Sequence, residues 1–467
     1  MGSSITPAKG RGAQVEEVEN ANMDEFKGQS QDPMILDFPE GGTRAWMAVA
    51  GAFLCLFVGG VEYSFGVFIT YYSSHFLKDE SVSNIAWVGS AAAFIHSTIG
   101  LLVGKLYDDG WFRQLIFVGS FLHVFCFMML SLCTKFWQVW LAQGLGMGLA
   151  TGILYQPALA IVSQYFERRR SLAMGIVMMG ASTGGVIFPI IMNNTIARLG
   201  FGWGVRVGAF VMLGILTIAN LCLKPRLSTR DMSGKAHLNM VLINEDILED
   251  TPPAQLRGIN YRQFFDLAFI VTTLGCFFIQ MGTGFPYAYI TSYATLEGQI
   301  SPNLQFYLLP ITFAGSAVGS PIMAGMADYV GVFNIVIIST IVSAGLQASI
   351  FGATTDGGAV AVSFLYGFMA AGFQSMMGPI YSKLSATVLE IGHRMGIGFF
   401  FIGIATLISS PIQGALLGSN PLTYIWWKPL VFSVLSLAIG VCFLVVSRFL
   451  LIRRWETVKM FLGVTRA

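Results

Sequence analysis

Glu62 and His96 are ionisable side chains inside long apolar stretches of the chain. A carboxyl or imidazole group in such surroundings carries a free-energy cost and can bind and release a proton. Counted along a helix from Trp46, Glu62 lies ~24 Å into its stretch, and His96 lies ~18 Å into the next one from its outer end. The two depths differ by ~12 Å, which argues against a direct pair. A proton or substrate role for Glu62 stands beside a structural one, whereas for His96 and His123 a structural role is favoured.

The composition indicates that these stretches belong to a membrane protein. Hydrophobic residues make up 54% of the 467 residues and charged residues 11%, with 53 glycines and 38 phenylalanines. A soluble protein of this length could not cover so much apolar side chain. The net charge of +2 gives no support to nucleic-acid binding. All six cysteines lie in apolar stretches, so the sequence predicts no disulfide framework, no metal site and no cofactor.

Twelve apolar stretches are each long enough to cross a hydrocarbon core of ~30 Å as a helix. They cover residues 45–71, 83–106, 114–134, 136–162, 170–193, 204–224, 264–290, 304–328, 333–352, 358–383, 396–418 and 427–452. The sequence therefore predicts an all-α membrane protein with twelve transmembrane helices in two six-helix halves. Its predicted parts are a disordered cytoplasmic N-terminal tail, 1–44, the first half, 45–224, a cytoplasmic linker, 225–262, the second half, 263–452, and a cytoplasmic C-terminal tail, 453–467.

The basic residues set the predicted orientation. Of the 27 lysines and arginines, all fall on the side of the termini and the linker except Lys78, Lys135, Arg198, Arg206 and Lys428. Because cytoplasmic loops are enriched in Lys and Arg, both termini are expected in the cytoplasm. No secretory signal or organelle address is recognised, so the plasma membrane is the expected location and the vacuolar membrane the alternative.

Two six-helix halves joined by a cytoplasmic linker resemble the major facilitator superfamily. The motif of that superfamily's second-to-third loop is matched by Gly104, Lys105, Asp108 and Arg113. Asp109 stands where a basic residue is common. The resemblance implies a latch that pairs with helix ends in one conformation and releases them in another. A solvated turn with cytoplasmic positive charge explains the loop equally well.

Two further motifs resemble signatures of the monocarboxylate porter family within that superfamily. The first is Glu40-Gly41-Gly42 with Trp46, directly before the first span. The second runs through Gln156-Pro157, Tyr165-Phe166, Arg168, Arg169, Arg170, Leu172-Ala173, Gly175 and Gly180. The three arginines mark a short cytoplasmic loop and become gating candidates beside the first loop.

The chain departs from this family where carboxylates are bound. The family's mammalian members use a lysine in the first helix and an Asp/Arg pair in the eighth. This chain has no Lys or Arg between Arg44 and Lys78. Ser316 and Ser320 stand at the pair positions. The carboxylate-binding chemistry therefore does not carry over, and the chain looks more like the family's fungal branch, which includes both uptake carriers and exporters.

The resemblance implies that the first, fourth, seventh and tenth helices line a substrate cavity. Besides Glu62 and His96, the predicted binding candidates on these helices are Tyr63, Gln143, Tyr155, Gln156, Gln280, Tyr287, Tyr366 and Gln374. With no buried Lys or Arg, this set suits an apolar substrate that has a few hydrogen-bonding groups. Each residue could instead join two helices, and about half are expected to face the cavity.

Small residues recur at four-residue spacing within several spans. The sets are Gly144, Gly148 and Gly152, Gly180 and Gly184, Gly315 and Gly319, and Gly414 and Gly418. Such spacing lets helix backbones approach closely, either in a static bundle or between helices that rock against one another.

The sequence predicts a transporter rather than an enzyme. It holds neither a nucleotide-binding loop nor a polar cluster with catalytic spacing. We expect a monomer in the bilayer that moves a small organic acid or fungal secondary metabolite by alternating access, with or without protons, and export is slightly favoured. The alternatives are an uptake carrier for a monocarboxylate or a vitamin such as riboflavin, and a transporter-like nutrient receptor.

Overall fold

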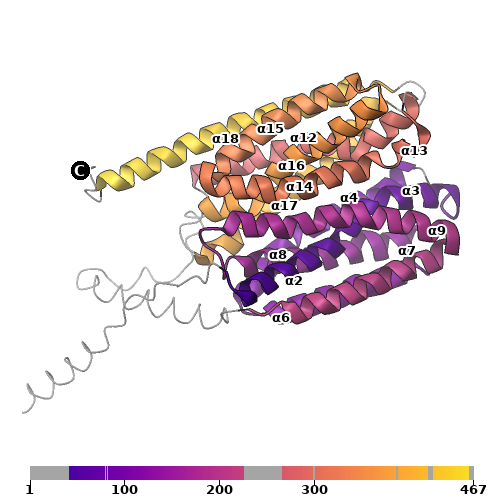
Figure 1. The fold of residues 1–467 in the computed structure, drawn as a ribbon, viewed down its shortest axis with the longest axis horizontal. Coiled ribbons are helices and arrows are strands. Elements are labelled where there is room, and N and C mark those ends of the chain that lie inside the picture. The colour runs from indigo at the N-terminus through magenta and orange to yellow at the C-terminus, as the bar shows by residue number, and fades with distance from the viewer. Residues whose placement is uncertain are drawn as a thin grey trace, which may run out of the picture. The chain divides into compact units, whose positions relative to one another are not determined.

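The computed structural model describes residues 41–78, 80, 82–225, 266–297, 300–384, 388–418 and 424–461. Within these ranges the chain forms helices joined by short connections, and the long helices lie side by side (Figure 1). The predicted N-terminal tail and linker lie almost wholly outside the described residues, as does the end of the C-terminal tail.

The N-terminal half is built from five spanning segments. The first joins α2 (Thr43–Gly59), the 3-10 helix η1 (Gly60–Ser64) and α3 (Phe65–Ser74), and the second joins α4 (Val82–Thr98) and α5 (Gly100–Asp108). The others are α6 (Phe112–Leu130), the run of α7 (Phe136–Val139), π-helix η2 (Trp140–Met147) and α8 (Gly148–Val162), and finally α9 (Arg170–Cys222).

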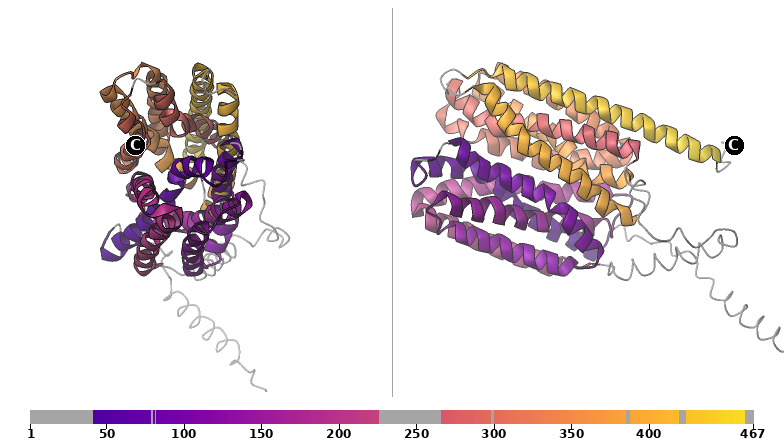
Figure 2. Two further views of the ribbon diagram at one scale, coloured as in Figure 1. Left: turned by 90° about the vertical axis from the view of Figure 1, so that its right-hand side faces the viewer. Right: turned by 180° about the vertical axis from the view of Figure 1, so that it is seen from behind.

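The C-terminal half lies beside the first and has the same all-helical character (Figure 2). Its helices are α12 (Leu267–Glu297), the short α13 (Pro302–Gln305), α14 (Leu308–Val330), α15 (Val332–Ser349) with the 3-10 turn η4 (Ile350–Gly352), α16 (Asp356–Leu384), α17 (Val388–Leu417) and α18 (Trp427–Phe461). The backbone of α18 continues past the predicted span, so the first part of the predicted C-terminal tail is helical.

α9 accounts for two crossings of the membrane. Among the described residues, eleven helices are long and apolar enough to span a bilayer. With 53 residues, α9 would measure ~80 Å if straight, more than twice a hydrocarbon core of ~30 Å. The chain reverses at Gly200, where φ is 77°, a value that glycine adopts without strain. Beyond this turn Gly204 packs against Ile196. Counting α9 twice gives the twelve predicted spans.

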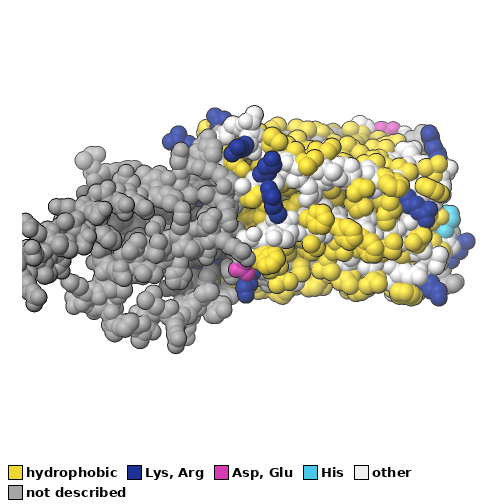
Figure 3. All heavy atoms as spheres, turned by 90° about the horizontal axis from the view of Figure 1, so that it is seen from below, with side chains coloured by type: hydrophobic (Ala, Val, Ile, Leu, Met, Phe, Trp, Pro, Cys, Tyr) yellow, Lys and Arg dark blue, Asp and Glu magenta, His cyan; other side chains and the backbone are white. Residues whose placement is uncertain are grey.

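The two ends of the bundle differ in the chain segments that reach them. We call the end at which α2 and α12 begin and α9 stops the linker end, and the opposite end the far end. Between the ends, hydrophobic side chains form a broad band, whereas Lys and Arg side chains gather at the ends (Figure 3). Large apolar side chains such as Phe117, Phe121 and Phe210 point outward in this band. Such a surface matches the hydrocarbon core of a bilayer.

Glycines bring α2 and α9 into close contact. A Cβ atom on Gly180 would overlap the carbonyl oxygen of Phe53, and one on Gly184 would overlap that of Phe57. Gly315 and Gly319, the pair predicted in the eighth span, let α14 approach α16 equally closely. Close approach of backbones increases van der Waals contact, which is a main attraction between helices in lipid. The four-residue spacing is thus a packing device at these pairs. It is not one at Gly414 and Gly418, because Gly418 follows the end of α17 and nothing lies within 4 Å of its Cβ position.

A pair of alanine substitutions in α9 tests this close approach. Gly184→Ala should destabilise the protein by roughly 1–3 kcal/mol, because the new methyl group meets the Phe57 carbonyl. Gly214→Ala should be neutral or stabilising by about 0.5–1 kcal/mol, since nothing lies within 4 Å of its Cβ position and alanine is the better helix former. The measurement is thermal unfolding in detergent, and equal midpoints for the two variants would contradict the packing.

Candidate functional site

A cavity lies between the two halves, near the middle of the bundle. Its lining residues are Tyr63, Met178, Ala181, Ser182, Tyr287, Phe313, Ser316, Ser320, Ala371 and Gln374. None of these lining residues is Asp, Glu, Lys, Arg or His. The cavity therefore presents aromatic rings, hydroxyl groups and one amide, and it can hold apolar surface and exchange a few hydrogen bonds.

The helices that line the cavity differ in part from the predicted set. The first, seventh and tenth spans contribute Tyr63, Tyr287 and Gln374, as expected. The fifth and eighth spans, which are the first part of α9 and α14, contribute more of the lining, and the fourth contributes none of these residues. The reason is that glycines let α9 and α14 touch across the two halves. At Gly185, for example, a Cβ atom would lie 3.0 Å from the Phe313 ring.

Aromatic rings and one hydroxyl chain organise the cavity wall. The ring centroid of Phe313 lies 4.2 Å from that of Tyr63 and 5.1 Å from that of Tyr287, so residues of both halves meet there. The Ser316 hydroxyl donates to the Gly367 carbonyl oxygen at 2.9 Å. Because that hydroxyl has one proton, the Tyr287 hydroxyl is the donor in its 3.0 Å contact with Ser316. The position where the family's carboxylate-binding pair is expected is thus occupied by a neutral network.

Four of the predicted lining residues join helices instead. Gln143, on η2, accepts a 2.7 Å hydrogen bond from Tyr72 in the buried interior of the N-terminal half. Gln156 packs against Gly100 of α5. In the C-terminal half Gln280 donates to Thr406 at 3.1 Å. Tyr366 donates to the Thr283 carbonyl oxygen at 2.7 Å. The hydrogen bonds of Gln143, Gln280 and Tyr366 join helices at membrane depth, the alternative that the sequence left open, and Gln156 fills the space beside Gly100.

Glu62 and His96 form a direct pair, so the prediction that they are too far apart was wrong. Glu62 Oε2 lies 3.3 Å from His96 Nδ1, with side chains 19% and 22% exposed. The depth estimate counted from Trp46 over an apolar stretch. The helical run in fact starts at Thr43 and continues to Ser74, which is ~48 Å, so Glu62 lies near its middle. His96 is likewise central in the run of α4 and α5.

Tyr155 connects this pair to the second half. Its ring lies 4.9 Å from the His96 ring and 6.0 Å from the ring of Phe399 on α17. Its hydroxyl donates to the sulfur of Met178, a cavity residue, at 3.4 Å. Tyr63, which directly follows Glu62, lines the cavity itself. The acid–imidazole pair therefore lies one residue away from the cavity wall.

At the linker end the two halves are joined by Asp328, which the sequence interpretation missed. Its carboxylate accepts backbone hydrogen bonds from Ser171 at 3.2 Å and Leu172 at 3.1 Å, at the start of α9. A carboxylate is favourable there because the first amides of a helix lack intrahelical acceptors. Arg170 also reaches across, and its Nη1 donates to the Ser382 hydroxyl at 2.9 Å. The halves are thus closed against each other at this end.

A spacing in the sequence could have indicated Asp328. In the second helix of the C-terminal half, the small residue Ala324 stands four positions before Asp328. In the second helix of the first half, Gly104 stands four positions before Asp108, so the spacing repeats. The Asp108 side chain lies outside what the structure describes, so the latch role of that loop remains a prediction. Its basic members Lys105 and Arg113 are exposed, as are Arg168 and Arg169.

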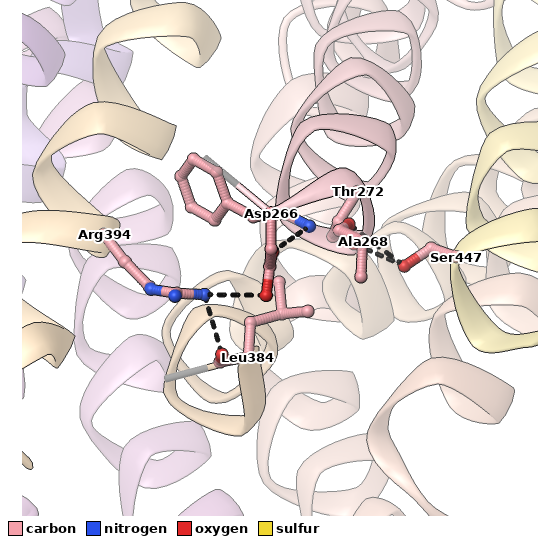
Figure 4. Close-up of polar contacts among 7 residues, drawn as sticks. Asp266, Ala268, Thr272, Leu384, Arg394 and Ser447 are labelled. Carbon is pink, nitrogen blue, oxygen red and sulfur yellow. Dashed lines mark hydrogen bonds and ion pairs between the residues drawn. The ribbon is translucent and has the colours of Figure 1, made fainter. Parts of the chain in front are cut away.

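A buried arginine fixes helix ends within the C-terminal half (Figure 4). Arg394, which the sequence interpretation counted as a loop charge, is only 2% exposed. Its Nη1 donates to the Leu384 carbonyl oxygen at 2.8 Å and lies 3.7 Å from Asp266 Oδ2. Asp266 Oδ1 accepts from the Phe269 amide at 2.8 Å at the start of α12. The starts of α12 and α17 and the end of α16 are therefore held together where the chain enters this half.

Removal of the Asp328 carboxylate should loosen the closure at the linker end. Hydrogen bonds to a charged group contribute about 1.5–3 kcal/mol, so in Asp328→Ala the amides of Ser171 and Leu172 should exchange with deuterium at least about tenfold faster. Peptide-level exchange followed by mass spectrometry measures this. The matched control is Asp356→Ala, which removes a carboxylate that caps Ser301 at the far end. Unchanged exchange at the start of α9 would show that Asp328 does not hold the halves together.

Comparison with known proteins agrees with the helical architecture. A family model described as Major Facilitator Superfamily matches residues 51–308, more than half of the chain. The aspyridones efflux protein apdF of Emericella nidulans is 35% identical over 81% of this chain and 73% of its own length. The fujikurins efflux protein of Gibberella fujikuroi is 34% identical over 88% and 84%. The MFS transporter asaE of Aspergillus flavus is 32% identical over 96% of each chain. The chain therefore belongs to the major facilitator superfamily, a family of multi-pass membrane transporters.

Proposed function

We propose that this transporter exports a largely apolar secondary metabolite by alternating access around the central cavity. Two similar proteins carry names that describe efflux, of aspyridones and of fujikurins. The observation that carries the proposal is the cavity itself, whose lining is aromatic, hydroxylic and free of charged side chains. The uptake and receptor alternatives gain no support from these relatives.

The chemistry of the cavity favours a substrate that is neutral where it touches the wall. An ionised carboxylate loses strong hydration on leaving water and needs a cation or several donors in return. None of the lining residues is cationic, and the hydroxyls of Tyr287 and Ser316 already donate within the wall. Aromatic faces such as those of Tyr63 and Phe313 instead suit flat, conjugated ring systems.

We also propose a relationship of the chain to the monocarboxylate porter family. The motifs before the first span and around Arg168 to Arg170 support membership of that family's fungal branch. Ser316 and Ser320 occupy the positions of the charged pair, and both line the cavity. We therefore place the chain with relatives that have retained the family's gate motifs and replaced its carboxylate site by a neutral one.

The Glu62–His96 pair supports exchange of the metabolite for protons. A carboxyl group is neutral when protonated and charged when not, and Tyr63, the residue after Glu62, lines the cavity. An exporter that releases its cargo when Glu62 takes up a proton from outside would use the proton gradient as its energy source. The basic residues at the linker end support a cytoplasmic placement of both termini, and we propose the plasma membrane as the location.

Transport by the purified protein in liposomes tests the cavity. Efflux of aspyridones and fujikurins should proceed, whereas lactate should not move. Phe313→Ala should slow efflux by roughly two- to tenfold, because a pair of stacked rings contributes about 0.5–1.5 kcal/mol beyond its buried area. The matched control is Phe117→Ala, which removes a ring that is 66% exposed on the outer surface. Faster movement of lactate than of either metabolite would contradict the proposal.

Glu62→Gln tests the proton step. The amide cannot ionise, so efflux should stop responding to an imposed pH gradient, while exchange of labelled for unlabelled metabolite across the membrane continues. Efflux in Glu80→Gln, which alters a carboxylate bonded to Asn84 at the far end, should keep its response to the gradient. The assay follows a pH-sensitive dye inside the liposomes together with metabolite release. Retention of full gradient dependence in Glu62→Gln would exclude this carboxyl group as the coupling site.

A further inference from the structure

The interior of the N-terminal half holds a group of polar atoms that have no partner among the described residues. They are Glu62 Oε1, Ser64 Oγ, Thr151 Oγ1 and both ring nitrogens of His123. Ser64 and His123 are fully buried, and Thr151 is 4% exposed. None of the three lines the cavity between the halves. Because an unpaired polar group inside a membrane is costly, such a group calls for a ligand.

These atoms share one depth in the half. The rings of Phe68 and Phe127 meet at 6.1 Å, and α3 and α6 both run from the linker end to the far end. Ser64 and His123 come four residues before these two rings, which is one helical turn nearer the linker end. The two residues are therefore level with each other.

The neighbouring helix α8 brings Thr151 to the same level. Gly119 of α6 packs on Leu154, and Cys126 packs on Gly146, so His123 lies opposite residues 149–151. On its other side α8 contacts the first span, since the Thr151 methyl group lies 3.2 Å from the Cβ position of Gly59. Gly59 directly precedes η1, which carries Glu62 and Ser64. Three helices thus carry buried hydroxyl, imidazole and carboxyl groups in one region of the half, within about two helical turns of one another along the bundle.

We propose that this place is a buried water site and that His123 is a second proton acceptor, linked through bound water to the Glu62–His96 pair. A buried water makes about three hydrogen bonds, and the hydroxyls of Ser64 and Thr151, the carboxylate and the imidazole supply that number. The ligand is water carrying a proton. The inference rests on the proton step of the proposed function and adds a residue of the third span to it.

The proton movement balances without any further reactant. The bound water, carrying an extra proton as hydronium, gives that proton to a ring nitrogen of His123 and becomes water. The imidazolium N–H bond then breaks towards the bound water, which passes one of its own protons to Glu62 Oε1. An imidazolium and a carboxylate become a neutral imidazole and a carboxylic acid, so the charge of the cluster does not change during the transfer.

Few other titratable groups surround His123. On α6 itself and on the elements in contact with it they include Cys126, Lys105 and Tyr107 at the linker end of α5, Tyr155 on α8 and Arg206 on α9. Tyr63 on η1 and His96 on α4 lie beside Glu62. Arg206 donates to Ser131 and stacks on Trp203 at the far end, away from the cluster. In the proposed site His123 exchanges its proton with Glu62, which is paired with His96.

Nitrogen NMR of the full-length protein in lipid nanodiscs, labelled only at histidine, tests the site. The chain has five histidines, and His123→Asn and His96→Asn assign two signals. Magnetisation should pass from water to the ring nitrogens of His123 in the unsubstituted protein. Their shifts should also move in Glu62→Gln and in Thr151→Val, which removes a hydroxyl and keeps the side-chain shape.

The control is Thr217→Val, because Thr217 is exposed on α9 and its hydroxyl bonds only to the Leu213 carbonyl oxygen. It should leave the His123 signals unchanged. Absence of transfer from water, or shifts that respond to neither Glu62→Gln nor Thr151→Val, would overturn the inference and make His123 a dry packing residue. No transported metabolite enters these measurements, so their failure is separate from a failure of the proposed export.

Discussion

A bilayer provides no water for a buried polar group, and the arrangement of this protein follows from that constraint. Polar side chains at membrane depth lie against one another or against helix carbonyls, as Gln143 does with Tyr72 and Tyr366 with Thr283. Such bonds hold each half as a unit. The polar groups without such a partner include those around Glu62, which we propose as a proton site, beside the cavity between the halves, which we propose as the substrate site.

The same constraint separates rigid contacts from movable ones. Within a half, glycines allow helix backbones to touch, as between α2 and α9. Such closely packed contacts cannot be loosened in small steps. Between the halves at the linker end the directional contacts include the Asp328 carboxylate on α9 and Arg170 on Ser382. They lie at the end of the bundle, where water can replace them when the halves separate. Two stable arrangements of rigid halves are what alternating access requires.

The sequence predicted the fold well because hydrophobic length is a strong signal. Eleven helices among the described residues are long and apolar enough to span a bilayer, and the reversal of α9 at Gly200 makes this agree with the twelve predicted spans. Depth was harder, since the ends of apolar stretches are not the ends of helices. The Glu62–His96 contact was missed for that reason.

Side-chain roles were the least predictable part of the site. The sequence does not show in which direction a polar side chain on a lining helix points. Tyr63, Tyr287 and Gln374 therefore reach the cavity while Gln280 joins two helices. Contributions from the fifth and eighth helices depend on how the two halves meet, which no local pattern encodes. Asp328 could have been found, because its spacing repeats that of the first half.

We propose that the metabolite binds between the halves, on a neutral aromatic wall. Photo-crosslinking tests this with a diazirine derivative of the exported metabolite, followed by mapping of the labelled peptides. We expect label on the peptides that hold Tyr63, Tyr287 or Phe313, and loss of this label with excess unmodified metabolite. If competition removed label only from peptides on the outer surface, such as the one with Phe117 and Phe121, the proposed binding site would be wrong.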